Sequence, residues 1–187
     1  LEARRSGIPS MGAGAIYPVV EAEIKVKDLA IPAHWKRAYT LDVGWNRTAA
    51  LWGAMDPESD CLYLYAEHYR GQAEPVIHAT AIKARGEWMK GGIDPAARGR
   101  SQDDGKRLFD LYKSLELHIQ VVDNAVESGL YEVWQRLSTG RLKVFASLGH
   151  FFAEYRLYRR DEKGRIIKEN DHLMDCARYL VLNWDKL

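Results

Sequence analysis

The sequence predicts one α/β domain built on a mixed sheet that helices cover on both faces. Three short apolar, β-branched and aromatic segments follow one another between residues 37 and 70, as in an antiparallel meander. Beyond them, segments with helical spacing alternate with short buried strands up to the C-terminal end. Alternation of this kind adds parallel strands, because each connecting helix crosses one face of the sheet. A chain of 187 residues is long enough to bury one sizeable core.

The composition excludes several classes of protein. The chain is 47% hydrophobic and 28% charged with a net charge of +1, so charge alone indicates neither a nucleic acid nor a membrane. No apolar run approaches the roughly 18 residues of a membrane span. The basic start lacks the apolar segment of a secretory signal. Cys61 and Cys176 stand alone, which argues against a disulfide framework or a structural zinc site and fits a reducing compartment.

Residues 1–36 are expected to form an arm or linker ahead of the main domain, which then spans 37–187. Gly, Pro and Ser punctuate "GIPSMGAG", and "VVEAEIKVKDLAI" alternates weakly, as an edge strand or an extended strap does. The sequence begins with Leu1 rather than Met, so we expect a piece of a longer protein.

The first half of the domain is expected to contain the meander and one helix. "RAYTLDVGW" (37–45) predicts a strand that runs into a turn, and "RTAALWGAMD" (47–56) predicts its antiparallel partner. "CLYLYAEHYR" (61–70) alternates apolar and polar residues and predicts the third strand, after a turn at "DPESD". The stretch 73–89 has helical spacing, with Pro75 near its first turn.

The middle of the chain predicts one strand–helix–strand unit. "GGIDPAARGRSQ" (91–102) is a very short strand that breaks into a basic loop containing glycine. A helix is expected over 103–116, and "LHIQVVDN" (117–124) predicts a buried strand.

The C-terminal part predicts a further alternation of helices and strands. The expected elements are a helix at 127–140, a strand at 141–147, a helix at 149–160, a small hairpin at 161–170 and a last helix at 171–184.

Acidic residues stand where predicted strands or helices meet loops. Asp42 lies near the end of the first strand, and Asp94 ends the next short strand, where Pro95 forces the chain out of regular pairing. In "NDHLMDCARY", Asp171 and Asp175 are four residues apart, a spacing that puts two side chains on one helix face. Clustered carboxylates raise one another's pKa unless a positive charge lies among them. Mg²⁺ or Mn²⁺ supplies that charge and takes oxygen ligands, and His172 suits Mn²⁺ as a nitrogen donor.

Each of these residues also has an ordinary structural explanation. Asp42 before Gly44 fits a turn, and Asp94 before Pro95 fits an Asx turn. Asp171 fits a helix start, where the macrodipole favours acids. A single histidine such as His172 is commonly packed or solvated. Asp175 is the hardest to explain in this way, because it interrupts an apolar helix face and needs a partner or a cation there.

Four stretches carry a resemblance to a known family. "YTLDVGW", "GGIDPAARGRSQDDG", "VVDNAVESGLYEVWQRLSTGRLKVF" and "NDHLMDCARYLV", in this order, resemble the C-terminal nuclease domain of a tailed-bacteriophage terminase large subunit. The resemblance covers residues 37 to about 184. It implies a ribonuclease H-like fold, in which a mixed central sheet combines an antiparallel meander with parallel strands. The first motif is shared by many ribonuclease H-like and sugar-kinase-like proteins, whereas the second and fourth are more specific.

The resemblance also implies a site and an activity. The family's metal-binding acids fall on Asp42, Asp94 and Asp175, with His172 as the additional ligand that some members have. Asp171 is left open between binding metal directly and supporting a ligand. The implied enzyme is an endonuclease with two divalent ions, Mg²⁺ or Mn²⁺, in which Asp42 bridges the ions. It cuts concatemeric double-stranded viral DNA when packaging into the procapsid begins and ends.

The family's other components set expected partners. In the full-length protein these are an upstream ATPase domain, the portal protein and the small terminase subunit, in the host bacterial cytoplasm and transiently at the procapsid portal. This sequence departs from the full-length pattern, because neither a Walker A motif nor a dinucleotide-binding glycine motif is present. We therefore expect a nuclease domain that has been separated from its motor.

Two basic segments are expected to contact DNA. Arg98 and Arg100 follow Asp94 closely, where they are suited to hold a phosphate, although a solvated loop is the alternative. The second segment is the predicted hairpin, which is equally compatible with a solvated surface. Its candidate residues are Arg159, Arg160, Lys163 and Arg165. Three tryptophans are expected in the core rather than on a base-stacking surface: Trp45, Trp88 and Trp134. Nothing indicates direct base readout, so strong salt dependence is expected.

Three other functions remain open at this point. A resolvase or transposase shares the fold, and junction-cleavage assays separate it from an enzyme that cuts linear DNA. An actin-like or sugar-kinase-like ATP-binding domain shares the "DVGWNRTAALWG" hairpin but needs a second phosphate loop and a longer chain. A non-catalytic DNA-docking or portal-docking module is distinguished by magnesium-dependent nicking.

Overall fold

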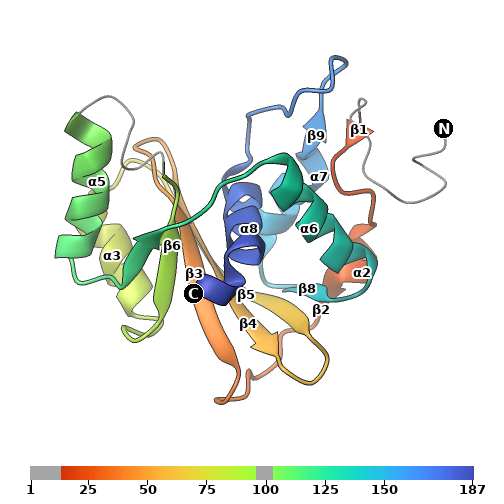
Figure 1. Ribbon diagram of the computed structural model, residues 1–187, viewed down its shortest axis with the longest axis horizontal. Coiled ribbons are helices and arrows are strands. Elements are labelled where there is room, and N and C mark those ends of the chain that lie inside the picture. Colours follow the sequence, from red (N-terminus) through yellow and green to blue (C-terminus); the bar gives the residue numbers. More distant parts are fainter. Residues whose placement is uncertain (1–13, 96–102) are drawn as a thin grey trace.

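A seven-stranded mixed sheet forms the centre of the computed structural model, which describes residues 14–95 and 103–187 (Figure 1). The strand order is β2-β8-β5-β4-β3-β6-β7. The strands are β2 (Lys25–Val26), β3 (Lys36–Asp42), β4 (Thr48–Asp56), β5 (Cys61–Arg70), β6 (Lys90–Ile93), β7 (Ile119–Val121) and β8 (Leu142–Phe145). A separate antiparallel pair joins β1 (Gly14–Ala15) to β9 (Arg159–Arg160).

Helices lie on both faces of this sheet. They are α2 (Glu21–Ile24), α3 (Pro75–Lys83), α5 (Asp103–Ser114), α6 (Glu127–Ser138), α7 (Gly149–Leu157) and α8 (His172–Leu182), followed by the 3₁₀ turn η1 (Trp184–Lys186). In Figure 1, α3 and α5 lie on one side of the sheet, and α6, α7 and α8 lie on the other. None of the helices within 14–95 and 103–187 is long and apolar enough to cross a membrane.

The pairing of the strands confirms the predicted mixed sheet. Strands β3, β4 and β5 form the antiparallel meander, with Asp42 opposite Ala49 and Asp56 opposite Cys61. The later strands add in parallel: β6 on β3, β7 on β6 and β8 on β5. Parallel neighbours end at the same edge of a sheet, so β3, β6 and β7 bring their carboxyl ends together.

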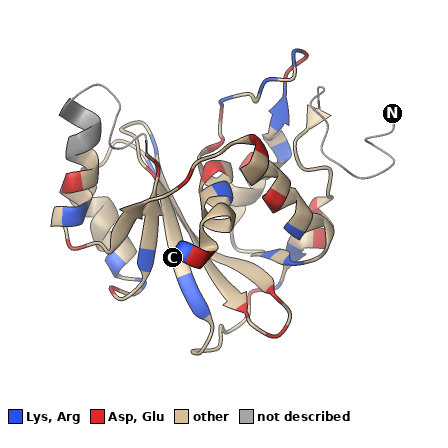
Figure 2. Cartoon of the chain, viewed as in Figure 1, with Lys and Arg blue, Asp and Glu red and all other residues tan. Residues whose placement is uncertain are grey.

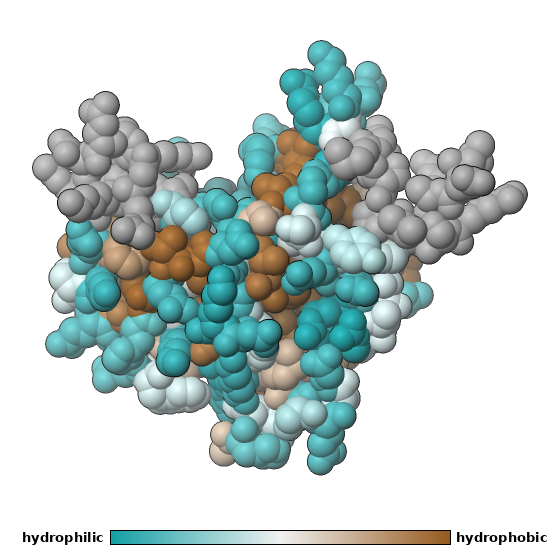
Figure 3. Space-filling model, viewed as in Figure 1, coloured by the Kyte–Doolittle hydropathy of each residue, from teal (hydrophilic) through white to brown (hydrophobic). Residues whose placement is uncertain are grey.

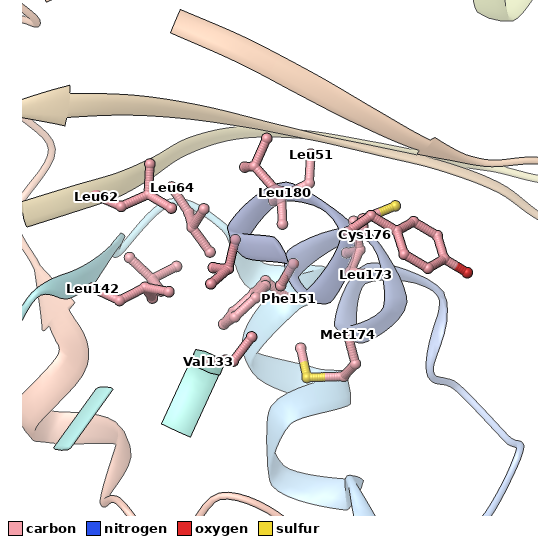
Figure 4. Packing of buried hydrophobic residues seen from close by; sticks show 14 of the residues in the cluster. Leu51, Leu62, Leu64, Val133, Leu142, Phe151, Leu173, Met174, Cys176 and Leu180 are labelled. Atoms are coloured by element: carbon pink, nitrogen blue, oxygen red, sulfur yellow. The ribbon is translucent and has the colours of Figure 1, made fainter. Parts of the chain in front are cut away.

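Strand alternation divides the core between the two faces. On β4, Leu51 packs with the α6–α8 side, whereas the neighbouring Trp52 packs with α3 and α5. Figure 4 shows strand residues such as Leu51 and Leu62 meeting Leu180 of α8. Because α8 is covered by sheet and helices, eight of its residues are buried. It is therefore the most enclosed helix on this face, and it carries the acidic motif at its start.

The segment before residue 37 takes part in the same core. Strand β2 pairs in parallel with β8 at the edge of the sheet, as the weak alternation predicts. Ile16, Tyr17 and Ile24 are buried in the core cluster of the α6–α8 face. The part of the segment from residue 14 onward is thus packed on the domain. Its origin as a linker to an upstream domain stays a prediction.

Three expectations about this fold are wrong. The helix expected over 73–89 ends at Lys83, because Gly86 has a φ of +135°, which no helix contains. The helix expected to reach residue 160 ends at Leu157, because Arg159–Arg160 pair with β1. Trp45 and Trp88 are 61% and 65% exposed, whereas Trp134 packs against the core as expected.

Gly91 offers a test of the strand packing. A Cβ atom at Gly91 on β6 would collide with the ring of Tyr39, which is buried. We expect Gly91→Ala to lower the free energy of unfolding by about 1–3 kcal/mol, measured by urea denaturation, because overpacking strains the core. Gly149→Ala is the matched control, since a Cβ there meets nothing within 4 Å. We expect it to change the stability by less than about 0.5 kcal/mol. Equal effects would contradict this packing.

Candidate metal centre

Two of the predicted acids lie side by side at the carboxyl edge of the sheet. Asp42 is the last residue of β3, and Asp94 directly follows β6. The register pairs Leu41 with Ile93, so the two acids leave their strands at neighbouring positions. Adjacent strands are separated by about 4.8 Å. Sheet topology therefore brings together two residues that are far apart in the sequence.

The remaining predicted residues come from the start of helix α8, which packs against the sheet. They are Asp171, His172 and Asp175. The hydroxyl of Thr40 on β3 donates a buried hydrogen bond of 2.7 Å to the carbonyl of Cys176 on α8. With the helix fixed there, Nδ1 of His172 lies 3.0 Å from Oδ2 of Asp42. The contact orients the imidazole and the carboxylate toward each other. It is the direct link between the first and last acidic motifs.

Protein groups hold both oxygens of Asp94. The hydroxyl of Tyr179 on α8 donates to Oδ2 at 3.1 Å, and the side-chain amide of Asn124 donates to Oδ1 at 3.1 Å. Asn124 lies in the segment between β7 and α6. Asp94 is thus connected both to α8 and to the segment after the neighbouring parallel strand.

Asp171 and Asp175 are acids in the first turn of α8 and are largely shielded from solvent. Asp171 is the N-cap residue, and its carbonyl accepts the amide of Asp175 at 2.8 Å. Among the described residues, Oδ2 of Asp171 has no hydrogen-bond partner, and Nζ of Lys168 lies 3.5 Å from it. Oδ1 of Asp175 accepts from Nη2 of Arg178 at 3.2 Å. An ion pair therefore accounts for the difficult position of Asp175 in an apolar helix.

The acids perturb one another electrostatically. Burial, followed by the negative charges of Asp171 and Asp42, raises the pKa of Asp175 to about 6. Burial likewise raises the pKa of Asp42, with contributions from Asp94 and Asp171, while His172 opposes the shift. The bond to Asp42 raises the pKa of His172. All five predicted residues thus belong to one electrostatic cluster.

The chemistry of this cluster fits a divalent cation. It offers carboxylate oxygens and one imidazole, the donor types that Mg²⁺ and Mn²⁺ accept. Oδ2 of Asp171 accepts no hydrogen bond from the described residues and has only the ammonium of Lys168 nearby, at 3.5 Å. This oxygen and the mutual repulsion of the acids both favour added positive charge. Within 14–95 and 103–187, no group of three or more His, Cys, Asp or Glu residues is already gathered closely enough to enclose an ion. The side chains are of the types that bind such a cation and lie in one region. Apart from Asp171, they are hydrogen-bonded to other protein groups.

The residues expected to contact DNA have different fates. Arg98 and Arg100 lie outside the described residues. Arg159, Lys163 and Arg165 are exposed on a hairpin that projects beside α8 and is strongly hydrophilic (Figures 2 and 3). Arg160 is only 6% exposed, and its guanidinium binds the carboxylate of Glu127 and the carbonyl of Gly164. Arg160 therefore stabilises the base of the hairpin, contrary to its expected place on the DNA-contacting surface.

Several residues of the site were missed from the sequence. Glu154 on α7 is 2% exposed, and its Oε1 accepts the amides of Leu173 and Met174, which caps the start of α8. No local pattern predicts this, because the contact joins two separate helices. The pair formed by Asp175 and Arg178 had a detectable signal, since an acid and an arginine three residues apart share a helix face.

The fold and the acidic edge define a ribonuclease H-like domain, and comparisons with known proteins agree. Residues 40–183 match the family described as Terminase RNaseH-like domain. The large terminase subunit of Salmonella phage P22 is 35% identical over 95% of this chain. The chain belongs to the terminase RNaseH-like domain family, which confirms the resemblance seen in the four motifs. It spans 37% of the length of that P22 subunit.

Solved structures show the same fold. The nuclease domain of the P22 large terminase superimposes with a TM-score of 0.86 at 28% identity, over 94% of this chain and 95% of the other. The large terminase nuclease domain of bacteriophage SPP1, solved with bound Mn, gives a TM-score of 0.62 at 14% identity, over 87% and 96% of the two chains. The second similarity concerns the fold alone.

The raised pKa of Asp175 predicts a pH-dependent response to metal. Its folded pKa of about 6 exceeds the ordinary 3.8, so the folded chain binds more protons and its unfolding free energy falls as pH rises between these values. The loss is roughly 1–3 kcal/mol. Bound Mn²⁺ offsets the repulsion between Asp175 and the neighbouring acids. At low pH, protons compete with Mn²⁺ for the same carboxylate. We expect Mn²⁺ to raise the melting temperature more at about pH 7.5 than at about pH 5. An equal rise at both, measured by calorimetry, would contradict the cluster.

Proposed function

We propose that this chain is the metal-dependent endonuclease domain of a large terminase subunit, which cuts concatemeric viral double-stranded DNA when packaging begins and ends. The observation that carries the proposal is that Asp42 interacts electrostatically with both Asp94 and Asp175, within a terminase RNaseH-like domain. The Mn-bound SPP1 nuclease domain supports the use of a divalent ion.

The proposed metal ligands have distinct roles. Asp42 ends a central strand that pairs on both sides, so its main chain is held rigidly, and it would be the ligand shared between the two ions. Asp94, which follows the neighbouring strand, and Asp175 on α8 would provide the further carboxylates that hold the ions. His172 and Asp171 lie in the same cluster, His172 beside Asp42 and Asp171 one turn before Asp175.

Two divalent ions, when bound, supply Lewis acidity that lowers the pKa of the attacking water and offsets the charge on the leaving 3′ oxygen. The chain itself supplies the acids that hold the ions. No protein side chain serves as the nucleophile, because water attacks the phosphate. Glu154 caps α8 and thereby holds Asp171 and His172 at the edge. Because its pKa is about 6, Asp175 is ionised at neutral pH and then offers its carboxylate oxygens to a cation.

The proposed DNA contacts are the hairpin and the basic residues Arg98 and Arg100, which follow Asp94 in the sequence. The hairpin is joined to the first turn of α8 by residues 168–171, so DNA held against it lies next to the acids. Arg159, Lys163 and Arg165 present exposed charge there, although Arg165 also pairs with Asp161. These charges recognise phosphates rather than bases.

We also propose the other components with which this domain works. We infer an upstream ATPase domain in the complete protein, with the portal protein and the small terminase subunit as partners. The proposed location is the host bacterial cytoplasm, transiently at the procapsid portal. The family membership supports each of these, because the P22 relative is a large terminase subunit.

Asp42→Asn tests the catalytic proposal. The amide keeps the shape of the side chain but loses the charge that holds a cation. We expect Mn²⁺-dependent or Mg²⁺-dependent plasmid cleavage to fall by at least about 100-fold, because even residues that only orient metal ligands contribute about 10–100-fold. The circular dichroism spectrum should be unchanged. Asp110→Asn, an exposed acid on α5, is the control and should cut normally. Wild-type inactivity with Mg²⁺ and Mn²⁺ would favour a docking module instead.

The hairpin charges predict a salt-dependent contribution to DNA binding. We expect the double substitution Arg159→Ala with Arg165→Ala to weaken binding of linear duplex DNA, measured by fluorescence anisotropy. The slope of log K against log salt should fall by about 1 for each phosphate that the variant no longer binds. Lys90→Ala is the control, since Lys90 starts β6 at the opposite end from Asp94. An unchanged slope in the double variant would show that the hairpin is only a solvated surface.

A further inference from the structure

Arg178 is a buried cation at the centre of the contacts that surround the acidic edge. Its side chain is 3% exposed, although it lies on α8 among apolar residues. Burying a guanidinium costs several kcal/mol unless its donors are satisfied. Nη2 binds Asp175, and Nη1 donates to the carbonyls of Asn124 and Ala125, whereas Nε has no hydrogen-bond partner among the described residues. The charge therefore joins the last acid of the site to the segment that follows β7.

The same segment reaches the second acid. The main-chain carbonyl of Asn124 accepts from Arg178, while its side-chain amide donates to Asp94 at 3.1 Å. A continuous path of hydrogen bonds thus runs from Asp175 through Arg178 and Asn124 to Asp94. Tyr179, the next residue on α8, closes the path by donating to the other oxygen of Asp94.

Two further contacts keep this path in place. Asn183, 1% exposed at the end of α8, donates to the carbonyl of Asp123 at 2.8 Å and accepts the amide of Asp123 at 2.9 Å. Gly129 on α6 lies against the stem of Arg178, where a Cβ atom would be 2.7 Å from Cγ. The stretch "DNAVESG" (123–129) is therefore built around Arg178.

We propose that Arg178 and Asn124 are positioning residues that set the separation and orientation of Asp94 and Asp175, and so the affinity of the site for divalent cations. This inference rests on the proposed function, because it assumes that these two acids hold metal. Neither residue touches the reacting atoms in this scheme. Their effect passes through carboxylates whose oxygens they bind. Partners that orient metal-binding groups typically contribute about 10–100-fold in metal affinity.

Arg178→Met tests the link, because an apolar side chain of similar length removes the donors and fills the space. Removing one partner of a buried ion pair is destabilising, because Asp175 is left without its cation, so the melting temperature of this variant is measured beside its metal affinity. We expect Mn²⁺ binding, measured by isothermal titration calorimetry on the purified chain, to weaken at least about tenfold. DNA cleavage should require correspondingly more Mn²⁺. Arg178→Lys should recover only part of the loss, because an ammonium lacks the guanidinium fork.

Arg136→Met is the matched control. Arg136 also binds a carboxylate and two main-chain carbonyls, from Asp60 and Arg141, but it lies away from the acidic edge. We expect wild-type Mn²⁺ affinity in this variant. Equal Mn²⁺ affinity in Arg178→Met, Arg136→Met and wild type would overturn the inference.

Asn124→Ala keeps the test decisive if Arg178→Met does not fold. Asn124 is exposed, and its main-chain carbonyl remains available to Arg178. We expect weaker Mn²⁺ binding with an unchanged melting temperature without metal, and unaltered binding would refute the link. In the double variant, the two losses should be less than additive, since one path is broken twice. If wild type itself binds no Mn²⁺, the proposed function fails, whereas wild-type affinity in the variants rejects the positioning role alone.

Discussion

Helix α8 lies so close to β3 and β4 that the geometry of the acidic edge depends on this contact. Gly53 on β4 permits the approach, because a Cβ atom there would be 2.8 Å from Cδ2 of Leu180. The buried bond from Thr40 to Cys176 fixes the helix along its axis, and the leucines seen in Figure 4 fill the interface. A shift of α8 would therefore move Asp171, His172 and Asp175 together relative to Asp42.

The cost of this arrangement is a concentration of negative charge beside an apolar helix. Burial and mutual repulsion raise the pKa of Asp42 and of Asp175, which would destabilise the fold if nothing opposed them. The fold opposes them locally: His172 contacts Asp42, Tyr179 and Asn124 hold Asp94, and Arg178 pairs with Asp175. The same contacts that stabilise the acids also fix their positions, so the stability of this edge and the geometry of the proposed metal site depend on one set of hydrogen bonds.

The sequence predicted the local elements well and the long-range contacts poorly. The meander strands were placed to within a few residues, because alternation and turn residues are local signals. The end of α7 was missed, because its cause is the pairing of Arg159–Arg160 with residues 14–15. Arg160 was assigned to DNA for the same reason: its partner Glu127 is 33 residues away. Spacing placed Asp171 and Asp175 on one helix. The strand ends suggested that a mixed sheet could bring Asp42 and Asp94 to one edge, and the register of β3 with β6 makes them neighbours there.

In the proposed site, acids at the ends of β3 and β6 and on α8 hold divalent metal at one edge of the sheet. Anomalous diffraction from crystals of this chain grown with Mn²⁺ tests it most directly, because the signal locates the ions without reference to activity. We expect anomalous peaks bounded by Asp42, Asp94 and Asp175. Full occupancy of Mn²⁺ at another place, or no peak among these three residues at saturating Mn²⁺, would contradict it.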